Sequence, residues 1–214
     1  MIQINNLTAK YKHQIVLNNV TLSFDEGERV ALIGVNGSGK TTLLKCISGL
    51  NKNYVGNIYY SDKTIGFLFD EIKINNYLTV KDFFKIYDIV PNTTTEKFIC
   101  FDEFKNKKFN QLSLGYKKRA AFLSIINKDI LLLDEPFNGL DFKSTDIIID
   151  YITNELKNKT ILISTHQISH LENLCTHIIF IHKGKVSQKF TMDEMLQKYS
   201  NIKIAADEIY AKLG

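Results

Sequence analysis

The sequence of 214 residues contains no tryptophan, only two prolines and only three cysteines. Cys46, Cys100 and Cys175 lie far apart and form no C-x-x-C pair or Cys/His cluster, which argues against a zinc site and a disulfide framework. Free thiols are typical of reducing, intracellular compartments. We therefore expect three reduced cysteines in a cytoplasmic protein, with Cys46 packed on a helix.

Long apolar runs and targeting signals are also missing. No stretch approaches the roughly 18 consecutive apolar residues of a membrane-spanning helix, and residues 1–11 lack the segments of a signal peptide. The chain has 27 Lys and Arg against 23 Asp and Glu, and the net charge of +4 is too small to indicate nucleic acid as a partner. The sequence therefore predicts that the protein contacts a membrane only through a partner protein.

An apolar share of 44% and a charged share of 23% are typical of globular proteins. Five segments are continuously apolar and rich in β-branched residues, as strands buried on both faces are. Helical patterns separate them, so the sequence predicts an α/β fold with a mainly parallel sheet covered on both sides. The expected strands are Arg29–Gly34, Thr64–Phe69, Asp129–Leu133, Thr160–Ser164 and His177–His182, and the expected helices are Lys40–Leu50, Leu114–Asn127 and Ser144–Lys157.

The two ends of the chain follow other patterns. Ile2–Leu7 and Val20–Phe24 alternate apolar and polar residues, which predicts an N-terminal antiparallel β-subdomain. Near the C-terminus, Thr191 and Glu194 have the spacing of a capping box and predict the start of the terminal helix.

A helical subdomain is expected at about residues 70–125, where the alternation of strands and helices is interrupted. Thr79 has the pattern of a helix start, Pro91 is expected to end that helix, and a second polar helix is expected at Thr93–Glu103. No linker or composition break divides the sequence, so we expect a single domain over residues 1–214.

The most specific local feature is residues 34–41, which read GVNGSGKT and fit G-x-x-x-x-G-K-[ST] between an apolar strand and a helix. Glycines let the backbone curl so that its N–H groups point at phosphate oxygens. Lys40 can reach the β- and γ-phosphates, and Thr41 offers its hydroxyl to Mg²⁺ at a helix start that favours an anion. The predicted phosphate site consists of Gly34, Asn36, Gly37, Ser38, Gly39, Lys40, Thr41 and Thr42.

A second candidate is the apolar run 130–133, which ends in Asp134 and Glu135. An acid at this strand end lies beside the metal that Thr41 holds, so Asp134 is expected to bind Mg²⁺, directly or through water. Glu135 can orient or deprotonate the water that attacks the γ-phosphorus. His166 follows the fourth apolar strand at the carboxyl edge of the sheet, where its neutral ring can donate to a γ-phosphate oxygen.

With these motifs in order, the sequence resembles the ATP-binding cassette (ABC) ATPases over nearly its whole length. Residues 111–119 (QLSLGYKKR) are similar to the ABC signature, and residues 138–141 (NGLD) are similar to the D-loop, which implies a role for Asp141 at the nucleotide. Tyr11 lies where the family carries an aromatic residue that stacks on adenine, and His166 matches the switch histidine. The resemblance implies a P-loop NTPase (RecA-like) core with an antiparallel β-subdomain and an inserted helical subdomain.

In ABC proteins two cassettes pair head to tail, and each signature closes over the ATP that the other holds. Ser113 and the backbone of Gly115 are expected at the start of a helix, which is a second anion site. The resemblance implies an ATPase that uses ATP and Mg²⁺, pairs as a homodimer or with a second cassette, and powers a separate transmembrane permease. It also implies a peripheral location on the inner face of the cell membrane, with no nucleic-acid partner.

Two features depart from the usual family pattern. The signature is commonly Leu-Ser-Gly-Gly-Gln, whereas this chain has Leu114 and Tyr116 at the third and fifth positions and keeps Ser113 and Gly115. The LSLG form is similar to that of ATPases of bacitracin- and lantibiotic-type exporters. Where most members carry a glutamine that touches Mg²⁺, this chain has Asp70, an acid that can hold the metal through water. Both features favour an exporter by analogy.

The family's helical subdomain has an exposed groove that receives a coupling helix of the membrane subunit. Phe83, Phe84 and Tyr87 are candidates for that groove, but their helical spacing favours the core of the subdomain itself.

Other functions are less consistent with the sequence. Soluble ABC ATPases of translation or DNA maintenance usually have two fused cassettes or a long coiled-coil insertion, and 214 residues leave no room for either. A P-loop GTPase should show Asn-Lys-x-Asp, but residues 127–130 place the acid one position early. A nucleotide kinase needs lid arginines, and arginine occurs only at Arg29 and Arg119. A non-hydrolysing binding module is disfavoured by Glu135.

Overall fold

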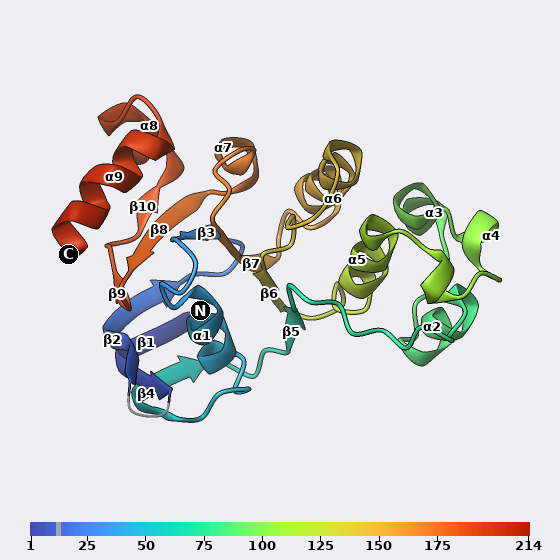
Figure 1. The fold of residues 1–214 in the computed structure, drawn as a ribbon, viewed down its shortest axis with the longest axis horizontal. Helices are drawn as coiled ribbons and strands as arrows, with labels where there is room; N and C mark the ends of the chain where they lie inside the picture. The colour runs from blue at the N-terminus through green and yellow to red at the C-terminus, as the bar shows by residue number, and fades with distance from the viewer. Residues whose placement is uncertain (12–13) are drawn as a thin grey trace.

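The computed structural model describes residues 1–11 and 14–214, and its central element is a mainly parallel β-sheet (Figure 1). The strand order is β10-β8-β3-β7-β6-β5, and neighbouring strands from β8 to β5 run parallel. β9 and β10 pair with β8 in the antiparallel sense. The bounds are β3 Arg29–Ile33, β5 Ile65–Leu68, β6 Ile130–Asp134, β7 Thr160–Thr165, β8 His177–His182, β9 Lys185–Val186 and β10 Phe190–Thr191.

A second, antiparallel sheet has the order β2-β1-β4 and packs over α1 on one face of the central sheet. Val30 and Leu32 of β3 belong to this apolar cluster, whereas Ala31 and Ile33 belong to the cluster on the other face. Because successive residues of a strand point to opposite faces, a strand that is apolar at every position must be covered on both sides. The bounds are β1 Ile2–Tyr11, β2 Gln14–Phe24, β4 Tyr54–Tyr60 and α1 Lys40–Ile47.

Helices α2 to α5 gather at one end of the molecule, away from the antiparallel sheet, and the C-terminal helices α8 and α9 lie beside β8 and β10 (Figure 1). Aromatic side chains of α2, α3 and α5 form much of the apolar core of the helical end. The bounds are α2 Val80–Ile86, α3 Thr93–Ile99, α4 Phe101–Phe104, a 3-10 helix Phe109–Gln111, α5 Leu114–Leu123, α6 Phe142–Glu155, α7 Leu171–Leu174, α8 Met192–Lys198 and α9 Ile202–Leu213.

The parallel strands bring their carboxyl ends to one edge of the sheet. Asp134, the last residue of β6, is paired in register with Ser164 of β7, and Ile33 of β3 is paired with Thr165. The segments that follow these strands therefore begin side by side. These are the segments in which the sequence places the phosphate loop, the acids and the histidine, so one sheet edge brings all three together.

The predicted core strands are confirmed, and β8 has the predicted bounds. The predicted N-terminal strands are too short, because β1 extends to Tyr11 and β2 begins at Gln14. Sequence reasoning missed β4. It is an edge strand in which half-buried and exposed residues alternate, but its exposed side also carries apolar residues, including Val55 and Tyr59, so its sequence does not alternate between apolar and polar residues.

Two helix predictions in the helical region were wrong. The helix predicted at Thr93–Glu103 is divided into α3 and α4 at Cys100, whose φ of 50° lies in the left-handed region. The preceding helix ends at Ile86, before Pro91, and Asp88 also has a φ of 50°. Neither residue is a glycine or an asparagine, so the sequence carries no strong signal for these breaks.

Both predicted helix starts are confirmed as capping boxes. The Thr79 hydroxyl accepts from the backbone N–H of Asp82, and the Thr191 hydroxyl accepts from that of Glu194. Each acid also accepts a hydrogen bond from the backbone N–H of its capping threonine. However, the box at Thr191 caps α8, and α9 rather than α8 is the terminal helix.

The predicted core role of the aromatic residues in α2 is confirmed for two of the three. Phe83 and Phe84 are 1% and 2% exposed, whereas Tyr87 is 47% exposed. Tyr87 covers Phe83 from outside, with ring centroids 4.5 Å apart. It therefore lies at the surface of the helical end and does not belong to its core.

The cysteines are free thiols, and Cys46 is buried on α1, as predicted. Burial raises the pKa of Cys46 to about 11 and that of Cys175 to about 12, so both stay protonated at neutral pH. Within the described residues, no helix combines the length and the apolar character needed to cross a bilayer.

Replacing Phe122 with alanine is expected to lower the free energy of unfolding by about 3–5 kcal/mol. Phe122 is fully buried between Phe98 of α3 and Tyr151 of α6, so its removal leaves a cavity where the helical end meets the core. Urea denaturation followed by circular dichroism measures the change. Ile86→Ala, at a position that is 59% exposed, is the control and should change stability by less than about 1 kcal/mol.

Candidate functional site: a phosphate loop beside two acids

The loop between β3 and α1 has a backbone that requires glycine. Gly37 and Gly39 have φ values of 79° and 114°, which residues with a Cβ rarely adopt. A Cβ on Gly39 would also lie 2.8 Å from Leu17 Cδ2. The loop curls at these two positions as the sequence pattern predicts.

Several hydrogen-bond donors of this loop have no protein acceptor within residues 1–11 and 14–214. They include the backbone N–H groups of Gly37, Gly39, Lys40 and Thr41 and the buried hydroxyl of Ser38. Unpaired N–H groups at a helix start, together with the helix dipole, favour a bound anion. The loop therefore fits the phosphates of a nucleotide.

A cavity of about 240 Å³ opens over the loop. It brings together most of the predicted phosphate-site residues, both acids that follow β6, and Asp70. The lining residues are Val16, Asn36, Gly37, Ser38, Gly39, Lys40, Thr41, Thr42, Asp70, Asp134 and Glu135.

Lys40 is 6% exposed, and its ammonium group is held inside the loop. Its Nζ donates to the carbonyl oxygen of Gly34 at 2.7 Å and lies 3.2 Å from Glu135 Oε1. Gly34 thus contributes through its carbonyl group and not to the cavity lining. Because a phosphate and the Glu135 carboxylate both attract this ammonium, a bound nucleotide competes with the Lys40–Glu135 ion pair.

The Asp134 side chain is fixed by hydroxyl groups on two sides. Thr41 Oγ1 lies 2.9 Å from each carboxylate oxygen of Asp134, and Ser164 Oγ donates to Oδ1 at 2.6 Å. Asp134 is 4% exposed, so these contacts replace the water that it lost on burial. They hold the carboxylate beside the Thr41 hydroxyl, as the sequence predicts.

Glu135 and His166 form a second pair. His166 Nδ1 lies 3.0 Å from Glu135 Oε2, and the Glu135 backbone N–H donates to the Ser164 carbonyl oxygen at 3.0 Å. Glu135 has a φ of 46°, a left-handed conformation that is uncommon for a residue with a side chain. Such a conformation persists where neighbouring contacts enforce it, and it directs the carboxylate toward Lys40 and His166.

The oxygen atoms of Thr41 and Asp134 fit a Mg²⁺ ion. Both side chains line the same cavity, and Mg²⁺ prefers oxygen ligands. No group of three or more His, Cys, Asp or Glu residues arranged for a metal ion occurs in the part of the chain that the structure describes. Mg²⁺ usually keeps several waters and binds through one or two protein groups plus phosphates.

Asp70 lines the cavity, but its carboxylate already has protein partners. The side-chain amide of Asn138 donates to both Asp70 oxygens at 3.2 Å, and Lys118 Nζ lies 3.5 Å from Oδ1. The predicted role of Asp70 at the metal stays a prediction. The lysine was not expected from the sequence.

The signature residues lie at the start of α5. Ser113 is exposed and is the N-cap of that helix, and its hydroxyl accepts from the backbone N–H of Tyr116. Gly115 is buried against α6, where a Cβ would overlap with the side chain of Ser144. Asp141 is the N-cap of α6, and hydrogen bonds from Ser144 lower the pKa of its carboxyl group.

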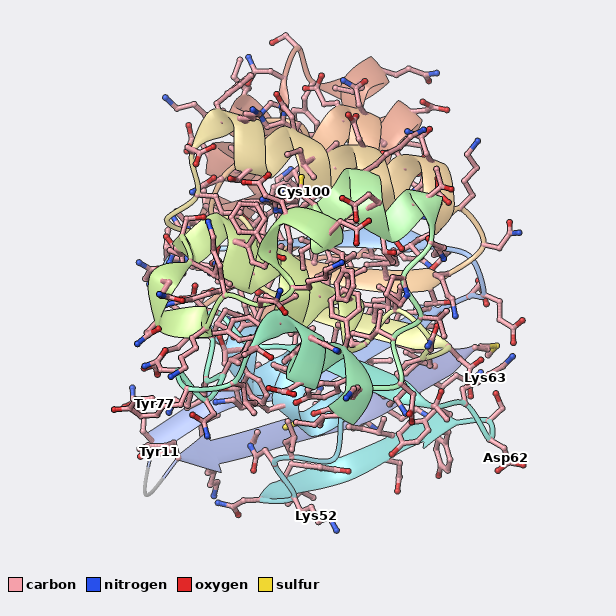
Figure 2. The ribbon with its side chains drawn as sticks, turned by 90° about the vertical axis from the view of Figure 1, so that its right-hand side faces the viewer. Tyr11, Lys52, Asp62, Lys63, Tyr77 and Cys100 are labelled. Carbon is pink, nitrogen blue, oxygen red and sulfur yellow. The ribbon has the colours of Figure 1, made fainter. Side chains whose placement is uncertain are left out.

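Ser113, Gly115, Asp141 and Tyr11 do not line the phosphate cavity formed by the described residues of this chain. Tyr11 is 72% exposed at the outer end of β1 (Figure 2). The chain therefore brings together the phosphate loop and the acids of the expected site. The expected roles of the signature and of Tyr11 depend on a second cassette and on a bound nucleotide.

Sequence reasoning missed three residues of the site. Val16 of β2 lines the cavity, Ser164 bonds to Asp134, and Lys118 contacts Asp70. Ser164 carried a signal, because it is a polar residue that directly follows the apolar run Ile161–Ile163 of β7. Lys118 carried a weaker signal. It is one of two adjacent lysines in a helix, and only the folded structure shows which of the two is buried.

Residues 17–138 match the model of a protein family described as ABC transporter. The chain is 32% identical to an ABC transporter ATP-binding protein of Methanocaldococcus jannaschii, over 94% of this chain and 81% of the relative. It is 30% identical to the lantibiotic transport ATP-binding protein SrtF of Streptococcus pyogenes, over 95% of this chain and 97% of the relative. The family suggested by the motifs is therefore the one that whole-length comparison finds.

Solved structures give the same fold. An ATP-binding subunit of an ABC transporter superposes with a TM-score of 0.81 at 25% identity, covering 100% of this chain and 99% of that one. A dimeric ATP-binding cassette in a post-hydrolysis state, bound to ADP and Pi, superposes with a TM-score of 0.74 at 27% identity, covering 90% of this chain and 99% of that one. The predicted α/β core with a mainly parallel sheet and an antiparallel sheet is confirmed.

Proposed function

The chain belongs to the ABC transporter family of ATP-binding proteins, and we propose that it is the ATP-hydrolysing subunit of an exporter whose permease is a separate membrane protein. The observation that carries the proposal is the convergence of three groups on one cavity. These are the Lys40 ammonium, the Thr41–Asp134 pair and the Glu135 carboxylate; His166 does not line the cavity but contacts Glu135. ATP hydrolysis to ADP and phosphate is the chemistry for which this set is suited.

Each group has a role that follows from its contacts. The free N–H groups of the loop and the Lys40 ammonium bind the phosphates, and Thr41 with Asp134 would hold Mg²⁺. When bound, Mg²⁺ neutralises charge on the phosphates. Glu135 accepts a proton from the attacking water and positions the His166 ring through Nδ1. A ring that donates from Nδ1 to Glu135 also donates from Nε2 to a phosphate oxygen when both ring nitrogens carry a proton.

Head-to-tail pairing of two cassettes is supported by exposed apolar side chains near the signature. Leu114 and Phe142, at the first turns of α5 and α6, are 45% and 72% exposed, and Val35 of the phosphate loop is 52% exposed. A second cassette that covers the phosphate loop of this one with its own residues 113–115 would bury these side chains. The partner is a second copy or a related cassette.

A large groove supports contact with a permease. It has a volume of about 1120 Å³ and runs from β5 and the segment after it to α2 and α5. Phe69, Ile86 and Tyr87 line it and are 44%, 59% and 47% exposed. Such an apolar groove suits a helix of a membrane subunit, and this contact would hold the chain at the cytoplasmic face of the cell membrane.

The direction of transport is inferred from two similarities. The LSLG form of the signature is similar to that of lantibiotic-type exporters, and the relative SrtF, 30% identical over 95% of this chain, is named for lantibiotic transport. We therefore propose that the chain works with a permease and that the direction of transport is export. Co-purification with the membrane subunit tests the proposed permease partner.

Ser113→Arg is expected to abolish hydrolysis while leaving nucleotide binding by the single chain intact. Ser113 is exposed and lies outside the phosphate cavity, so a larger cation there obstructs only a cassette that docks from outside. A fluorescent ATP analogue measures binding, and release of phosphate measures hydrolysis. Asn110→Arg, at an exposed position just before the signature, adds the same charge and should preserve both activities. Loss of binding by Ser113→Arg would mean that the signature acts within its own chain or is structural.

A further inference from the structure

Lys118 is a lysine of α5 whose side chain is almost fully buried, at 1% exposure, and whose role the phosphate site does not explain. Its Nζ donates to the carbonyl oxygen of Asn138 at 2.7 Å and to that of Glu135 at 3.1 Å. The same nitrogen lies 3.5 Å from Asp70 Oδ1. One ammonium group therefore contacts three residues, one of which is Glu135.

These contacts form a closed network. Asn138 accepts from Lys118 through its carbonyl oxygen, and its side-chain amide donates to both carboxylate oxygens of Asp70. The network joins α5, the segment after β6 and the segment after β5. These three segments are far apart in the sequence. The sequence shows only that the segment after β5 contains an acid and that α5 contains lysines, which does not predict that they meet.

The charges of the network compensate each other. Taking an ammonium group out of water is costly, and this desolvation lowers the pKa of Lys118, while the charge of Asp70 acts in the opposite direction. A buried charge that loses its partner strongly destabilises its surroundings, whereas a pair that is removed together costs much less. Asp70 and Lys118 should therefore behave as a unit when they are substituted.

The position of Glu135 depends on this unit. Its left-handed backbone is held on the N–H side by Ser164, and on the carbonyl side by the Lys118 ammonium and the backbone N–H of Asn138, each 3.1 Å from the carbonyl oxygen. Loss of the Lys118 contact releases one of these restraints and lets the carboxylate leave the place where it meets Lys40 and His166. Small displacements of a catalytic group can lower a rate by about 100-fold.

We propose that Lys118 is a positioning residue for ATP hydrolysis, which acts by joining Asp70 to the backbone of Glu135. The proposal rests on the proposed function, because it assigns Glu135 to the hydrolytic step. Asp70 also lines the groove in which a membrane subunit is proposed to dock.

The test compares kcat for ATP hydrolysis and the affinity for a fluorescent ATP analogue in Lys118→Gln, Asp70→Asn and the double variant. Each single variant should lower kcat at least tenfold and change nucleotide affinity less than threefold. The double variant should lose no more kcat than either single variant, because both charges disappear together. Lys97→Met removes an exposed lysine of the same helical end and is the control.

A purely structural lysine would give a different pattern. The proposal would be overturned if the double variant lowered kcat by the product of the two single losses, about 100-fold. It would also be overturned if the single variants lowered only the melting temperature and left kcat unchanged. Asp70→Asn keeps the shape of a side chain that is 44% exposed, so this variant should fold. If Lys118→Gln alone does not fold, recovery of folded, active protein in the double variant still supports the pairing, and its failure argues against it. Inactivity of the unmodified protein would instead contradict the proposed function.

Discussion

Lys40→Ala is expected to weaken ATP binding by at least about 100-fold, to the point where a fluorescent nucleotide titration detects no saturation. The variant removes the one ammonium group that lies inside the phosphate loop among the described residues, with Nζ 2.7 Å from the Gly34 carbonyl oxygen. It also leaves the Glu135 carboxylate, which lies 3.2 Å from that nitrogen, without its cationic partner. An uncompensated carboxylate beside the cavity repels phosphate and adds to the loss.

Lys45→Ala is the matched control, because Lys45 lies in the same helix and carries the same charge but does not line the phosphate cavity. It should bind the nucleotide with unchanged affinity. Circular dichroism should show that both variants are folded. Undiminished affinity in Lys40→Ala would contradict the assignment of residues 34–41 as the phosphate loop.

The predictions that succeeded depend on local residue patterns and on the order of the parallel strands. The strand at residues 177–182 was found because every buried position is apolar, and the loop at residues 34–41 because its glycines must adopt left-handed conformations. Asp134 was placed beside Thr41 because the parallel order brings strand ends together. These rules use only side-chain polarity, backbone geometry and sheet topology.

The predictions that failed depend on contacts between distant segments. Cys100 adopts a left-handed conformation that its residue type does not indicate, and β4 is held by its pairing with β1 and not by a pattern of its own. The contacts of Asn138 and Lys118 with the Asp70 carboxylate were likewise not expected from the sequence. A sequence pattern does not specify which distant side chains meet.

Gly115 illustrates how a site residue can be constrained for two reasons. The sequence pattern predicts that its backbone lies close to a phosphate held by a second cassette. Within the chain, a Cβ at this position would overlap with the side chain of Ser144. Hydrogen bonds from Ser144 to Asp141 hold that side chain in place, so it cannot easily move away. Loss of activity in Gly115→Ala would therefore not identify a role in nucleotide binding, and Ser113, whose side chain is exposed, is the better position for that test.

Glu135→Gln is expected to lower kcat by at least about 100-fold and to leave a dimer that persists with Mg-ATP. Glutamine keeps the shape of the side chain, but it accepts no proton from the attacking water. It also removes the negative charge that lies 3.2 Å from Lys40 Nζ, so the lysine is free to bind phosphate and nucleotide affinity should not fall. Because ATP that is bound but not cleaved keeps joining the two cassettes, the paired state accumulates.

Size-exclusion chromatography with and without Mg-ATP measures the pairing, and release of phosphate measures turnover. Glu155→Gln, at an exposed position of α6, is the control and should hydrolyse ATP at the rate of the unmodified protein. The combination of low turnover and nucleotide-dependent pairing is informative because a misfolded variant would show neither nucleotide binding nor a discrete dimer. A Glu135→Gln variant that stays monomeric with Mg-ATP and hydrolyses at the normal rate would remove Glu135 from the reaction. It would also remove the basis for a positioning role of Lys118, because that role is assigned through its contact with the Glu135 carbonyl oxygen.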